Sequence, residues 1–167
     1  MNTKLKINKR KNHNKNIINN FETVDEIIGN PKKFQKYYEK ISEIYDDLPY
    51  KFRQKLRYLR ESLGLTREQL EEKSYISAQT IKQIETNDDR GYTIETLIAL
   101  CVGMQLPPEL SFDLLRMAGF SIEESVTPKN GLYCFILRNL YEQGIDNANK
   151  FLILNKEEPL TQQTTKE

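Results

Sequence analysis

The sequence predicts an all-α protein. Apolar residues recur every three to four positions along most of the chain, Ser, Thr and Pro stand where helices would begin, and Gly stands where several would end. No segment alternates apolar and polar residues as a half-buried strand does. With 167 residues, 38% hydrophobic and 29% charged, the chain has the length for one compact domain with extensions or for two small domains, and it is no disordered polyelectrolyte.

The N-terminal part of the chain is expected to consist of an arm and one helix. Residues 1–20 carry six Lys and Arg and no acid, which is typical of a disordered basic arm that is either merely solvated or in contact with DNA phosphates. Residues 21–50 form a flanking segment in which Pro31 begins a helix and Pro49 ends it. The apolar face of residues 31–48 packs on the neighbouring domain or forms a dimer. That face carries Phe34, Tyr38, Ile41, Ile44, Tyr45 and Leu48.

Five helices are predicted within residues 51–120. The second opens with a capping box, in which the Thr66 hydroxyl and the Gln69 amide satisfy backbone donors reciprocally. Ser77 and Thr93 are suited to cap the third and the fourth helix. A turn of three to four residues separates the second helix from the third, which is the spacing of a helix-turn-helix. The five helices are expected at about 52–63, 66–74, 78–86, 94–103 and 107–119.

The third of these helices has the side chains that a DNA-reading helix needs. In a helix-turn-helix the first helix crosses the duplex backbone and the second presents polar groups to base edges. Here Ile81 and Ile84 would point into the bundle, whereas Gln79, Lys82 and Gln83 would point outward. Glutamine suits adenine because its amide both donates and accepts in the major groove.

The C-terminal part is predicted to add two helices. In residues 121–155, Pro128 opens one helix that ends before Gly144, and the other runs from about 145 to 154. Their acidic composition and apolar faces suit a dimer surface or a protein partner better than DNA. Residues 156–167 read as a frayed tail.

Membrane proteins and enzymes are disfavoured. No apolar run approaches the roughly 20 residues that a bilayer span needs, and the N-terminus lacks the apolar stretch of a signal peptide, so we expect a cytoplasmic protein without a membrane partner. Cys101 and Cys134 lie in apolar segments and are expected to be core thiols. The single histidine, His13, lies in the basic arm, and no Gly-rich phosphate loop is present. We therefore expect no catalysis, no cofactor and no metal.

The motif around the predicted turn resembles a known family. Residues 63–70, 76–81 and 84–85 carry Gly-Leu-Thr, a following Leu, Ser-x-x-Thr-Ile and Ile-Glu, which is similar to the Cro/phage-repressor family of helix-turn-helix proteins, known in bacteria as xenobiotic-response-element-type regulators. The resemblance covers about residues 52–119. It implies a five-helix lambda-repressor-like helix-turn-helix bundle, here with flanking N- and C-terminal helices. It also implies a transcriptional repressor that binds double-stranded DNA as a homodimer, with its two recognition helices roughly 34 Å apart.

The same resemblance implies roles for single residues. It pairs Arg60 with Glu85 in a partly buried ion pair that ties the first helix of the bundle to the third. The positions that would read bases are Ala78, Gln79 and Gln83, with Lys82 beside them able to reach a base or a phosphate. The positions that would contact phosphates are Thr66, Arg67, Arg90 and Thr93.

Three positions depart from the family pattern. Glu71 replaces a small residue, and its carboxylate must point outward or find a partner. Tyr75 replaces the glycine of the turn, at a cost of about 1 kcal/mol if the left-handed backbone is kept. Asp88 and Asp89 follow the recognition helix, where they oppose phosphate binding. These acids favour an alternative, in which the protein is an antitoxin or a protein-interaction adaptor that binds a partner through residues 31–48 or 128–155.

Overall fold

The structure, a computed structural model, describes residues 30–86, 91–122 and 127–162, and every regular element within these ranges is a helix. The predicted all-α class is therefore confirmed. The arm predicted at residues 1–20 lies outside the described residues, as do residues 88–90 in the loop after the recognition helix. No helix of the described chain is both long enough and apolar enough to cross a membrane.

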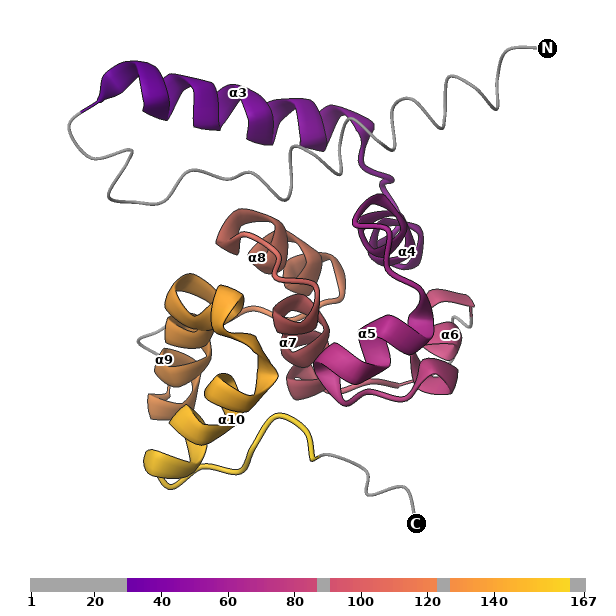
Figure 1. Ribbon diagram of the computed structural model, residues 1–167, viewed down its shortest axis with the longest axis vertical. Helices are drawn as coiled ribbons and strands as arrows, with labels where there is room; N and C mark the ends of the chain where they lie inside the picture. The colour runs from indigo at the N-terminus through magenta and orange to yellow at the C-terminus, as the bar shows by residue number, and fades with distance from the viewer. Residues whose placement is uncertain (1–29, 87–90, 123–126, 163–167) are drawn as a thin grey trace.

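Helix α3 (Pro31–Asp47) is the outermost element and lies across one end of the molecule (Figure 1). It begins where the sequence predicts, because Asn30 accepts a hydrogen bond from the Lys33 N–H and Pro31 occupies the first helical position. It ends where Leu48 leaves the helical region and Pro49 follows.

The next five helices form the predicted bundle, and α7 lies at its centre (Figure 1). Every residue of α7 from Leu97 to Gly103 is buried. The capping box of α5 is confirmed: the Thr66 hydroxyl accepts from the Gln69 N–H at 3.1 Å, and the Gln69 side chain accepts from the Thr66 N–H at 2.9 Å. The helices are α4 (Phe52–Ser62), α5 (Arg67–Ser74), α6 (Ala78–Thr86), α7 (Ile94–Gly103) and α8 (Pro108–Met117).

A glycine sets the distance between α5 and the central helix. A Cβ atom on Gly103 would lie 2.8 Å from Cβ of Ser74 and 3.1 Å from Cδ1 of Leu70. Only glycine therefore lets α7 approach α5 this closely without a shift of the backbone. The close approach holds the first helix of the helix-turn-helix against the core.

The C-terminal part departs from its prediction in two places. The helix predicted to begin at Pro128 and to end before Gly144 ends as an α-helix at Phe135, and a π-turn and a 3-10 turn complete the path to Gly144. Gly144 has a φ of 80° and begins the next helix instead of ending the previous one. The elements are α9 (Pro128–Phe135), η1 (Ile136–Leu140), η2 (Tyr141–Gln143) and α10 (Gly144–Leu154).

The prediction of a frayed tail from residue 156 is wrong for the described part of that tail. Leu160 is buried, and its N–H donates to the side chain of Asn149 at 2.9 Å. The amide of Asn149 donates in turn to the Thr161 carbonyl at 2.8 Å. The segment is therefore held against α10 by the burial of Leu160 and by the Asn149 side chain, which hydrogen-bonds the backbone of both Leu160 and Thr161.

A charged cluster joins α9 to the central helix. The Tyr133 hydroxyl donates to Oε1 of Glu95 at 2.6 Å, and Nζ of Lys129 lies 3.2 Å from the same oxygen. Burial by itself would raise the pKa of Glu95, but the hydrogen bonds from Tyr133, the backbone and Lys129 outweigh it and lower the pKa from 4.5 to about 2.

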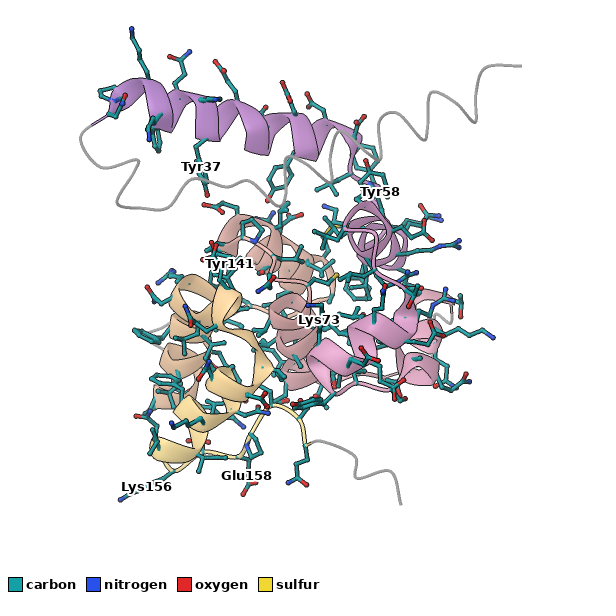
Figure 2. All side chains as sticks on the ribbon, in the orientation of Figure 1. Tyr37, Tyr58, Lys73, Tyr141, Lys156 and Glu158 are labelled. Carbon is teal, nitrogen blue, oxygen red and sulfur yellow. The ribbon has the colours of Figure 1, made fainter. Side chains whose placement is uncertain are left out.

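This cluster makes the stability of the fold depend on pH in acid. Because the pKa of Glu95 is lower in the folded chain, its contribution is present above about pH 4.5 and is lost as the pH falls toward 2. As the pH falls from about 4.5 toward 2, the wild-type chain should lose unfolding free energy because Glu95 becomes protonated. The Glu95→Gln chain lacks this carboxylate, so its loss over the same pH range should be smaller by on the order of 1 kcal/mol, allowing for the partial exposure of the carboxylate. Urea unfolding at several pH values measures this. Glu158→Gln, on the exposed tail (Figure 2), is the control, and equal pH profiles for the two variants would contradict the prediction.

Candidate nucleic-acid interface

Helix α6 presents a polar face outward, as its sequence predicts. Ile81 and Ile84 are fully buried in the core. Gln79 and Lys82 are exposed, and Gln83 is half-buried. The three polar side chains therefore lie on the side of α6 that faces away from the bundle.

The inner face of α6 carries a buried acid that receives two arginines. Nε and Nη2 of Arg60, on α4, lie 2.6 and 3.1 Å from the two carboxylate oxygens of Glu85. Nη2 of Arg67, on α5, lies 2.7 Å from Oε2 of the same carboxylate. The Glu85 side chain has no exposed surface, so its charge, which water cannot reach, is balanced by these guanidinium groups. The structure thus brings together the pair implied by the family resemblance and adds a third member.

The position of Arg67 differs from the one inferred from the sequence. As the first residue of α5 it was expected to face a phosphate, whereas the structure engages its Nε and Nη2 groups with Glu85. Its side chain stays 28% exposed, and the two arginines with one carboxylate leave one net positive charge. That charge borders an open cleft at the start of α5, whose lining includes Arg57 and Thr66 together with Glu61 and Glu68.

The departure at Glu71 has a structural explanation. Its carboxylate accepts a hydrogen bond from the N–H of Ala78, the first residue of α6, at 2.9 Å. The Ser77 hydroxyl accepts from the Thr80 N–H at 3.1 Å and so caps the same helix end. A carboxylate at a helix N-terminus is also favoured by the helix dipole. Glu71 has therefore found the partner that it required, and this partner is the recognition helix itself.

The other end of α6 is held from α4. Nη1 of Arg53 donates to the carbonyl of Ile84 at 2.8 Å, in the last turn of the helix, where carbonyls lack helical partners. Nothing in the sequence motif indicated this role for Arg53. The contact needs a long cation on a neighbouring helix, and only the packing of α4 on α6 brings it there.

The turn between α5 and α6 keeps its left-handed residue although it is not glycine. Tyr75 has φ 59° and ψ 18°. Its hydroxyl donates to Oδ1 of Asp146 on α10 at 2.8 Å, and this hydrogen bond raises the pKa of Tyr75. The contact with α10 offsets the strain of the left-handed backbone.

Two of the predicted phosphate contacts lie at exposed helix N-termini. Thr66 caps α5, and the Thr93 hydroxyl caps α7 by accepting from the Thr96 N–H at 3.2 Å. Both threonines are exposed, and a helix N-terminus favours an anion. Arg90, Asp88 and Asp89 lie outside the described residues.

The buried acid generates the first prediction at this interface. We expect Glu85→Ala to lower the free energy of unfolding by about 3 kcal/mol, because Arg60 would be left buried without its partner. Urea denaturation measures the change. Arg57→Ala is the control, since it breaks a partly exposed pair with Glu61, worth less than about 1 kcal/mol, and leaves the contacts of Arg60 in place. A loss for Glu85→Ala no larger than that of the control would show that the cluster adds nothing to stability.

The cap on α6 generates a second prediction. We expect Glu71→Gln to lower the unfolding free energy by about 1 kcal/mol, because the Ala78 N–H loses a charged acceptor next to the helix dipole. Glu72→Gln makes the same chemical change on the exposed side of α5 and should leave stability nearly unchanged. Thermal unfolding of the two variants measures the difference. Equal melting temperatures would show that the Glu71 carboxylate does not stabilise the N-terminus of α6.

Among the described residues, no three His, Cys, Asp or Glu side chains come together as metal ligands would.

Comparison with known proteins gives one result. Residues 56–110 match the sequence profile of a family described as Helix-turn-helix. Searches of the curated proteins and of the solved structures gave no significant match. The matched segment holds α5 and α6, their turn and the Arg60–Glu85 pair, and a domain of this kind supports a DNA-binding transcriptional regulator in general terms. Residues 56–110 are therefore similar to the Cro/repressor-like helix-turn-helix family, over the same stretch in which the sequence motif resembles it.

Proposed function

We propose that this protein is a transcriptional repressor that binds a specific double-stranded DNA sequence as a homodimer and reads the major groove with α6. The observation that carries the proposal is the way α6 is held. Its inner face is locked by Glu85, and its two ends are bound by Glu71 and Arg53. A helix fixed at both ends and on one face presents its remaining face in one orientation, as base readout requires.

The free face of α6 has suitable chemistry for base edges. Gln79 and Gln83 are four residues apart and therefore neighbours on the helix surface. Each amide can donate and accept toward adenine, and Lys82 between them can donate to a guanine or a phosphate. Ala78, half-buried at the start of the helix, leaves room for the groove wall and suits a thymine methyl group.

Phosphate contacts would flank this face. Thr66 and Thr93 offer exposed helix N-termini, and Arg67 retains exposed surface beside its partner Glu85. We include Arg90 in this set from the sequence. Contacts of this kind supply affinity and orientation without sequence information, so their signature is a strong dependence of binding on salt.

A second candidate function has its own support. Phe135, Ile153 and Leu154 are 45%, 58% and 72% exposed on α9 and α10, and Phe135 stacks on Phe151 with ring centroids 4.9 Å apart. Exposed apolar groups on these two helices suit a protein partner. An antitoxin or adaptor that binds a partner there is the alternative, and Asp88 and Asp89 in the loop after α6 favour it.

Selection of duplexes from a random DNA pool by the purified full chain tests the proposal. We expect an enriched motif with two related halves, whose log affinity falls steeply with log salt. The number of base pairs between the two halves of the enriched motif then gives the separation of the two half-sites. No enrichment and no binding at low salt would overturn DNA reading and leave the protein-interaction function.

The recognition face generates a prediction of its own. We expect Gln79→Ala combined with Gln83→Ala to abolish the preference for the selected motif while weak, salt-sensitive binding to any duplex persists. Fluorescence anisotropy with the motif and with a scrambled duplex measures the ratio of affinities. Gln143→Ala, an exposed glutamine far from α6 in the sequence, is the control. An unchanged ratio in the double variant would mean that α6 does not read the bases.

A further inference from the structure

The C-terminal segment, residues 144–161, contacts the turn of the helix-turn-helix at two consecutive residues. The Tyr75 hydroxyl donates to Oδ1 of Asp146 at 2.8 Å, and the Thr161 hydroxyl donates to the Ser74 carbonyl at 2.9 Å. The partners in these two contacts are 71 and 87 positions apart in the sequence. The turn is therefore bound by a part of the chain that lies outside the segment matched to the helix-turn-helix family.

The carbonyl of Ser74 is placed where it needs a partner. Helix α5 ends at Ser74, so this carbonyl is one of the last four in the helix, which have no helical donor. Ser74 has no exposed surface, and α7 covers it so closely that a Cβ atom on Gly103 would lie 2.8 Å from its own Cβ. A carbonyl in such a place is costly to leave unpaired, and the hydroxyl of Thr161 supplies the donor.

The chain reaches this carbonyl by a path that packing fixes. After α10 the backbone reverses at Lys156, whose φ is 64°. Leu160 is then buried in the core, and its N–H is held by the side chain of Asn149. The next residue, Thr161, follows directly from a buried and hydrogen-bonded neighbour. Its contact with α5 is therefore a defined feature of the fold.

Left-handed backbone is concentrated where the C-terminal segment meets the bundle. Within the described ranges, the non-glycine residues with positive φ are Tyr75, Gln105 and Lys156. Gln105 follows α7, and its side-chain amide donates to the Glu142 carbonyl just before α10, at 2.9 Å. Such residues persist only where their surroundings hold them, and they cluster at functional sites. Their distribution indicates that this contact region holds the backbone beside the turn in a specific geometry.

The first turn of α6 depends on this geometry more than its last turn does. Arg53 and the pairs made by Glu85 hold the C-terminal half of α6. The N-terminal half carries Gln79 and is separated from α5 by only three residues, so the backbone of Tyr75 sets the direction in which α6 begins. In a helix-turn-helix, the N-terminal residues of the recognition helix are the ones that contact base edges.

We propose that Asp146 and Thr161 are positioning residues for base reading by α6. The C-terminal segment holds the α5–α6 turn through them, and the turn sets where the first turn of α6 meets the bases. The inference rests on the proposed function and extends the reading machinery beyond the family segment. Neither residue has to touch DNA, because their effect reaches the bases through Tyr75 and Ser74.

The ratio of affinities for the selected motif and for a scrambled duplex tests the role of Asp146. It is measured by fluorescence anisotropy with the full chain, at a temperature at which every variant is folded. We expect Asp146→Ala and Tyr75→Phe each to lower the ratio about threefold to tenfold, as the loss of one hydrogen bond implies. The double variant should lower it no further, because both changes remove the same bond.

Two variants separate this bond from the charge of Asp146. Asp146→Asn is the conservative variant: it removes the charge and keeps an acceptor oxygen, so it should keep the wild-type ratio. Glu158→Ala removes one exposed acid elsewhere on the C-terminal segment and is the control for net charge (Figure 2). A contact that merely stabilises the fold would change the melting temperature but not the ratio among folded molecules.

The position of the lost specificity is a second readout. Thr161→Val keeps the shape of the side chain and removes its hydroxyl, so it should lower the ratio as Asp146→Ala does. Duplex selection with either variant should lose preference at the base pairs that Gln79→Ala relaxes. It should keep preference at the base pairs that Gln83→Ala relaxes, because the C-terminal half of α6 has its own anchors.

Amide hydrogen exchange of the chain without DNA tests the same contacts independently of reading. The N–H of Ile76 donates to Oγ of Ser74 at 3.2 Å, and the N–H of Ala78 donates to Glu71 at 2.9 Å. We expect both to exchange about threefold to tenfold faster in Asp146→Ala and in Thr161→Val than in the wild type. The amides of α8 should keep their rates.

The outcomes separate this inference from the proposed function. If the wild type selects a motif and neither Asp146→Ala nor Thr161→Val lowers the ratio, the positioning role is overturned and DNA reading stands. An equal loss in Asp146→Asn would assign the effect to charge and would also overturn it. If the wild type selects no motif, the proposed function fails and the reading role with it. Exchange then decides whether the C-terminal segment holds the turn: faster exchange supports this, and unchanged exchange overturns it.

Discussion

The arrangement of the helix-turn-helix depends on the buried carboxylate of Glu85. A charge without access to water costs several kcal/mol unless cations reach it. Arg60 reaches it from α4 and Arg67 from α5, so three helices must keep the separation and the angles that bring both guanidinium groups within about 3 Å of one side chain. Apolar packing of Ile81 and Ile84 alone would tolerate some rotation of α6 in its place, whereas the paired charges specify one orientation.

The C-terminal helices complete this arrangement instead of forming a separate unit. The Tyr75 hydroxyl bonds to Asp146 on α10, and the Thr161 hydroxyl donates to the Ser74 carbonyl at 2.9 Å. Both contacts meet the turn between α5 and α6. A residue in the left-handed region is strained unless its surroundings hold it there, and here the extension supplies those surroundings. Helix α10 and the segment after it therefore help to fix the turn that precedes α6.

Much of this fold could be predicted from the sequence because its signals are local. The capping box at Thr66 and the inward face of α6 need only neighbouring residues, and the Arg60–Glu85 pair came from the family resemblance. The partners of Glu71 and Arg67 could not be predicted, because each is fixed by the packing of separate helices. The π-turn after Phe135 was missed for a related reason: the apolar spacing there fits a continuous helix, and the tertiary packing of the extension decides the backbone.

The contacts of Glu85 and Glu71 also determine the charge that the outward face of α6 presents. The chain has a net charge of only +1, and its helix-turn-helix contains several acids, which at first favours a protein partner over DNA. One of these acids is neutralised internally, since Glu85 receives two arginines, and a second, Glu71, accepts the first N–H of α6 at the positive end of the helix dipole. What faces outward from α6 is then a lysine between two amides. A nearly neutral protein can thus present a locally cationic reading face, because its acids are used to hold that face in place.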